Sequence, residues 1–85
     1  MGSHKEEKFI SGIIKSFPKK YGRPRDFTFV IGENKRSYFF HISALKFGKW
    51  NDLVRAVEDK GYALIEFTHA NTPRGRIVTL ARMVK

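Results

Sequence analysis

The stretch YFFHISAL (residues 38–45) places a tyrosine and two phenylalanines directly before a histidine. Side chains alternate along a β-strand, so Phe39 and His41 share one face of a strand formed by this stretch. The opposite face carries Tyr38, Phe40 and Ile42. The face with Phe39 and His41 belongs either to a buried core or to an exposed aromatic surface on which a flat ligand can stack. That choice decides between a small barrel of unspecified role and a nucleic-acid-binding protein.

The segments around this stretch predict further strands separated by turns. Apolar and β-branched residues predict five strands, over residues 8–17, 27–31, 36–42, 62–67 and 76–84. Gly12 indicates a bulge or sharp bend in the first of them. Residues 32–35 form a turn that makes a hairpin of the second and third strands. The segments 18–26 and 68–75 are expected to be loops.

A helical period follows the third predicted strand. Trp50, Leu53, Val54 and Val57 are spaced as one face of a helix, which predicts a short helix over residues 51–60. We expect Asn51 or Asp52 to cap its start and Gly61 to end it in the left-handed conformation. Five strands with a short helix between the third and fourth predict an all-β fold, a five-stranded Greek-key barrel of the OB type. An SH3-like barrel has a similar number of strands, and periodicity does not separate the two.

The 85 residues suffice for one domain, which we place at residues 8–85. Residues 1–7 are expected to be a disordered N-terminal segment, in which Met1-Gly2-Ser3-His4 resembles the remnant of an expression tag. The chain has no cysteine, which excludes disulfides and thiolate metal ligands, and its three histidines lack a ligand spacing. We therefore expect neither metal nor cofactor. No apolar run approaches the roughly 18 residues of a membrane span and no signal peptide is evident, so a cytoplasmic protein without a membrane partner is expected.

Positive charge is concentrated in the first half of the chain. The formal net charge is +9, from 17 Lys and Arg against 8 Asp and Glu. Residues 1–50 carry a net +7 and residues 51–85 a net +2. Such a surface attracts polyanions, although charge that only keeps the protein soluble would give the same totals.

The second and third predicted strands bring aromatic side chains together. If their hairpin aligns Phe27 and Phe29 with Phe39 and His41, three phenyl rings and an imidazole share one face. Bases stack on such rings with about 1–3 kcal/mol each. Alternation by itself favours the opposite arrangement, with Phe27 and Phe29 in the core and Thr28 toward solvent. His41 is equally compatible with a half-buried structural role, and the residues alone leave both interpretations open.

Three segments resemble, in order, the strand motifs of the cold-shock domain family. They are GIIKSF (12–17), RDFTFV (25–30) and YFFHISAL (38–45), the last of which matches the family in residue class at every position. A fourth, RGRIVTL (74–80), is only vaguely similar to the closing strand. The resemblance covers residues 12–45, about two fifths of the chain.

The resemblance implies a five-stranded OB barrel that binds single-stranded RNA or DNA on its second and third strands, as an RNA chaperone or a regulator of transcription or translation. The resemblance also implies that Phe39 and His41 face outward, whereas Tyr38, Phe40 and Ile42 face inward. The residues expected to stack on bases are Phe17, Phe27, Phe29, Phe39 and His41, with Tyr21 as a replacement ring and Trp50 near a further aromatic position of the family. Those expected to contact phosphates are Lys15, Lys19, Lys20, Arg23, Arg25, Arg74 and Arg76.

The sequence also departs from the family pattern. Ser16 stands where the family has a stacking Trp, and Asp26 and Thr28 replace two glycines of the second motif. The segment 18–26 is longer than the usual connection. These differences predict a divergent member with an altered base preference or weaker binding per nucleotide.

Other function classes have less support. His41 and Ser43 are close in sequence, but no acid is expected to orient the histidine, so we expect neither catalysis nor a small-molecule substrate. A protein–protein adaptor is the main rival, because exposed aromatic patches also mark protein interfaces. A small barrel that binds duplex DNA is a further alternative. We expect a monomer.

Overall fold

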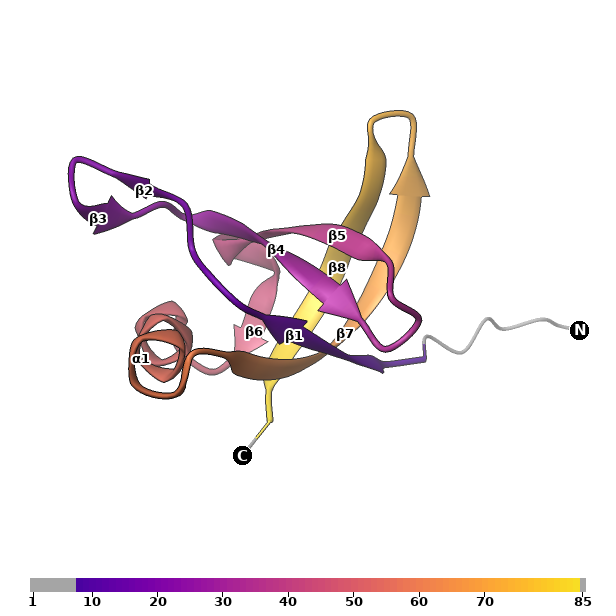
Figure 1. Cartoon of the computed structure of the whole chain (residues 1–85). Helices are drawn as coiled ribbons and strands as arrows, with labels where there is room; N and C mark the ends of the chain where they lie inside the picture. The colour runs from indigo at the N-terminus through magenta and orange to yellow at the C-terminus, as the bar shows by residue number, and fades with distance from the viewer. Residues whose placement is uncertain (1–7, 85) are drawn as a thin grey trace, which may run out of the picture.

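Five strands close into a β-barrel in the computed structural model, which describes residues 8–84 (Figure 1). They are β1 (Ile10–Ile14), β4 (Phe27–Gly32), β5 (Ser37–His41), β7 (Ala63–Thr72) and β8 (Gly75–Met83). β1 pairs antiparallel with β4 and β7, β4 with β5, and β7 with β8. A parallel pairing of β5 with β8, at Phe39 and Ile77, closes the ring. The expectation for residues 1–7 lies outside the described residues.

The remaining elements are short strands and helices that lie outside the five barrel strands. β6 (Leu45–Phe47) runs parallel to β8 and follows η1 (Ile42–Ala44), a single turn of 3₁₀ helix. β2 (Lys19–Lys20) and β3 (Arg23–Pro24) form a separate two-stranded hairpin. The helix α1 (Trp50–Lys60) lies between β6 and β7. No helix among residues 8–84 is long and apolar enough to cross a membrane.

The barrel interior is filled by side chains from every barrel strand and from the helix. The largest fully buried ones are Tyr38, Phe40, Phe67, Ile14, Leu53, Ile65, Val30 and Thr28. Gly12 packs directly against this core, because a Cβ at this position would come within 2.5 Å of atoms of Phe67 and Val30. The register of β1 runs through Gly12 without a shift, so the expected bulge is wrong and close packing explains the glycine.

The ends of several elements differ from the sequence-based expectation. The first strand covers only half of residues 8–17, and the loop expected at 68–75 is mostly strand, because β7 and β8 form a long hairpin. The helix begins at Trp50 after Lys49, and neither Asn51 nor Asp52 caps it. Its end is as predicted, since Gly61 is left-handed with φ of 88°. Ile42, expected to point inward, leaves the strand in η1 and is exposed.

Candidate nucleic-acid interface

The outer face of the β4–β5 hairpin carries four aromatic side chains. Phe27 pairs with His41, and Phe29 pairs with Phe39. The alternate pairs of the hairpin face the core, so these four side chains face outward, with Phe29 52% and Phe39 37% exposed. We call Phe27, Phe29, Phe39 and His41 the aromatic platform. The exposed position that simple alternation favours for Thr28 is wrong, because Thr28 is buried and its hydroxyl donates to the carbonyl of Ser16 at 2.6 Å.

The rings of the aromatic platform contact one another and form one surface. Phe27 and Phe39 lie at 28° to each other with centroids 5.5 Å apart, and Phe39 and His41 lie at the same angle 6.5 Å apart. Phe29 stands edge-on to Phe27 and Phe39. Such contacts hold each ring in place, which would reduce the entropy lost if a flat ligand stacked on it.

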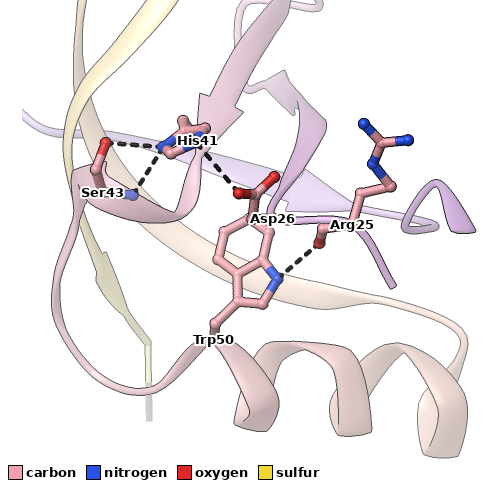
Figure 2. A network of polar contacts seen from close by, with 5 residues as sticks. All are labelled: Arg25, Asp26, His41, Ser43 and Trp50. Atoms are coloured by element: carbon pink, nitrogen blue, oxygen red, sulfur yellow. Dashed lines mark hydrogen bonds and ion pairs between the residues drawn. The ribbon is translucent and has the colours of Figure 1, made fainter. Parts of the chain in front are cut away.

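His41 is held from both edges of its ring (Figure 2). Its Nδ1 accepts the backbone N–H of Ser43 at 3.1 Å, so Nδ1 carries a lone pair. The Ser43 hydroxyl, 2.8 Å from Nδ1, must then donate its proton to it. The Nε2 edge faces the carboxylate of Asp26 at 3.7 Å. These contacts fix the plane of the imidazole and leave its face available for stacking.

The position of Asp26 corrects the expectation that no acid orients the histidine. Asp26, His41 and Ser43 follow one another in the order acid, base and hydroxyl of a catalytic triad, but with the two ring nitrogens of the histidine exchanged. The Nδ1 atom, however, already accepts the backbone N–H that begins η1, which makes His41 the cap of that turn. Capping therefore accounts for the close contact with Ser43. Among residues 8–84, no three His, Asp or Glu side chains gather in a way that could hold a metal ion.

A basic hairpin projects from the barrel next to the platform (Figure 1). We call residues 18–25 the basic arm; they include four cationic side chains and no acid. Tyr21 and Gly22 both have positive φ, 54° and 77°, as in the type I′ turns that suit a two-residue hairpin. The loop expected here is therefore an ordered hairpin. Lys20 and Arg23 are direct cross-strand partners, an arrangement of like charges that destabilises a hairpin without a bound anion.

The basic arm is joined to both the aromatic platform and the helix. The guanidinium of Arg25 lies over the ring of Phe27, 5.5 Å from its centroid. The indole Nε1 of Trp50 donates to the carbonyl of Arg25 at 3.1 Å, which anchors the base of the arm to α1 (Figure 2). At the tip, Tyr21 is 93% exposed, and Lys20 Nζ lies 5.6 Å from its ring centroid. The cations of the arm thus lie between the platform and the exposed ring of Tyr21 at the tip.

Two predicted stacking residues lie away from the outer face. Phe17 is only 8% exposed and belongs to the core, with its ring edge-on to Trp50 at 5.2 Å. Trp50 is half-buried and also packs edge-on against Phe40 at 5.1 Å. Neither ring belongs to the aromatic platform, because both fill the space between the barrel and α1.

The remaining predicted cations are exposed but differ in position. Lys15 follows β1, and Arg74 occupies the turn between β7 and β8. Arg76 lines a shallow groove together with Arg36, Asn71 and Thr72. Arg36 directly precedes β5, so this pair of arginines lies beyond the end of the platform opposite the basic arm. Sequence reasoning missed Arg36, because only the distant pairing of β5 with β8 brings it to Arg76.

No protein-family model matches the sequence, and no curated protein matches it significantly. A functional assignment therefore depends on the site itself. Its features are three phenyl rings and a fixed imidazole that share one exposed sheet face, and a projecting basic arm.

Proposed function

We propose that this protein binds single-stranded RNA or DNA, stacking bases on the aromatic platform and neutralising phosphates with the basic arm. The observation that carries the proposal is the register of the β4–β5 hairpin, which pairs Phe27 with His41 and Phe29 with Phe39 on the outer face. Rings on an exposed sheet face beside cations are the elements that bind single strands without strong sequence preference.

The proposal includes a divergent cold-shock-type OB barrel. The closed ring runs β1–β4–β5–β8–β7, with four antiparallel pairings and one parallel closing pair. This order supports a Greek-key path of the OB type, and α1 precedes β7, the fourth barrel strand along the chain, as expected for that fold. The binding surface of OB folds lies on their second and third strands, which here are β4 and β5.

The mechanism requires no chemistry on the ligand. Bases of a short strand stack on Phe29 and Phe39 and against the face of His41, each contributing about 1–3 kcal/mol. The phosphates next to these stacked bases face Arg25, Lys20 and Arg23 of the basic arm. A strand held in this way cannot pair with a complement, so binding would melt or prevent hairpins without ATP. That property suits an RNA chaperone or a regulator of transcription or translation.

Salt dependence follows from the phosphate contacts. Each neutralised phosphate on a single strand contributes a slope of about −0.7 to log affinity against log salt, so about four contacts give a slope near −3. The cross-strand pair of Lys20 and Arg23 is expected to contribute two of them, because an anion between these side chains relieves their mutual repulsion.

Titration with single-stranded and duplex oligonucleotides at two salt concentrations tests the proposal. Trp50 is the only tryptophan and bonds to the carbonyl of Arg25, so its fluorescence reports on the base of the arm. Tighter binding of the single strand, weakened by salt, is the expected result. Tighter binding of the duplex would instead identify a duplex-binding barrel. Binding of neither would overturn both and favour a protein–protein adaptor, for which exposed aromatic rings are also suited.

A further inference from the structure

A groove of about 380 Å³ lies beside the aromatic platform, between β5, η1 and β8. It is lined mainly by apolar surface, and Phe39 and His41 of the platform form part of its wall. Its lining also includes Ser43, Lys46, Ile77 and Thr79. The groove is therefore continuous with the platform but extends onto β8, a strand that carries none of the platform rings.

The groove exists because β8 lacks a neighbouring strand at this point. β8 pairs with β5 at Ile77 and with β6 at Ala81, and the chain turns away between them as η1. Residues 78–80 of β8 consequently have no registered partner on this side. A stretch of strand edge without a paired neighbour can offer main-chain donors and acceptors to a ligand.

The chemistry of the groove suits a flat ligand that has a polar edge and carries an anion. Phe39 and the fixed imidazole of His41 offer ring faces. Because the Ser43 hydroxyl donates its proton to Nδ1 of His41, its oxygen is left to accept a hydrogen bond from a ligand. Lys46 takes part in neither of the two ion pairs found among residues 8–84, so its charge is available for an anion.

We propose that this groove holds one nucleobase of the bound strand, with Lys46 contacting the adjoining phosphate. The inference rests on the proposed function and adds a subsite to it. The platform binds bases through ring faces, whereas this subsite would bond the edge of a base through the main chain of residues 78–80 and the hydroxyl of Ser43. Base preference, which stacking alone does not provide, would arise at this one position.

Two substitutions test the subsite independently. Lys46→Ser removes the proposed phosphate contact, and Lys60→Ser on α1 is its charge-matched control. We expect Lys46→Ser to reduce the magnitude of the salt slope by about 0.7 and Lys60→Ser to leave it unchanged. Ile77→Trp fills the groove. Since Ile77 is half-buried and this change can disturb the barrel, Lys46→Ser, at an exposed position, decides the question if the Trp variant does not fold.

Nuclear magnetic resonance spectra of the backbone amides locate the ligand directly. On addition of a thymidylate heptamer, the amides of residues 78–80 should shift together with those of the platform strands. In Ile77→Trp the platform shifts should persist and those of residues 78–80 should disappear. Platform shifts without any change at residues 78–80, or equal salt slopes for the two lysine variants, would overturn the subsite alone. Absence of any shift or binding would overturn the proposed function instead.

Discussion

Replacing Phe29 with alanine tests whether this half-exposed ring belongs to a binding surface or to the core. Full burial of a phenylalanine contributes roughly 1.5–3 kcal/mol, and Phe29 keeps 52% of its surface in solvent. We therefore expect Phe29→Ala to lower the free energy of unfolding by only about 1 kcal/mol, a fall in Tm of about 4–8 °C. Phe40→Ala, at a fully buried position, should cost about 3–5 kcal/mol.

The effect of Phe29→Ala on binding should be much larger than its effect on stability. Loss of one stacking ring removes about 1–3 kcal/mol, which weakens affinity about 5- to 150-fold. Phe47→Ala is the matched control, since Phe47 is 65% exposed but lies on β6, outside the platform. Thermal unfolding followed by circular dichroism and titration with a single-stranded oligonucleotide provide the two readouts. Unfolding of Phe29→Ala, or equal affinities for the two variants, would show the reasoning to be wrong.

Three further changes probe other parts of the structure. Gly12→Ala places a Cβ 2.5 Å from the ring of Phe67 and should lower the free energy of unfolding by about 1–3 kcal/mol, measured by urea denaturation; an unchanged midpoint would contradict the packing described. Tyr21→Asn should raise Tm slightly, because asparagine tolerates positive φ, while affinity falls with the lost ring; unchanged affinity would exclude Tyr21 from the site. Joint replacement of Lys20 and Arg23 by serine should reduce the magnitude of the salt slope by about 1.4, and an unchanged slope would exclude the pair.

The positions of the barrel strands could largely be predicted from the sequence, since strand and turn signals are local. The parts that failed depend on distant contacts. The segment 68–75 has the composition of a loop, but pairing between Thr72 and Gly75 extends both strands almost to the turn. The helix starts without a side-chain cap because Trp50, its first residue, is positioned by packing against Phe17 and Phe40.

The candidate site was only partly accessible from the sequence. Alternation grouped Phe39 with His41 but did not say which face was outside. The hydroxyl of Thr28 is satisfied by a carbonyl twelve residues earlier in the chain, which removes most of the penalty for burying it and allows Phe29 to face outward. No local pattern signals that bond. Likewise, Phe17 has the position of a family stacking residue in the sequence, and its burial beside Trp50 depends on packing against the distant helix.

The pairing that closes the barrel has a consequence for the motions of the protein. β5 and β8 share a single registered pair, Phe39 with Ile77, so few hydrogen bonds hold the ring shut at this seam. Local opening should begin there, and amide hydrogen exchange should be fastest at the edges of the seam. A single nucleic-acid strand bound across Phe39 and onto β8 would contact both edges of this seam from outside the barrel. The ligand would then act as a removable clamp across the seam, raising the free energy of opening by about 2.7 kcal/mol at a hundredfold excess over Kd.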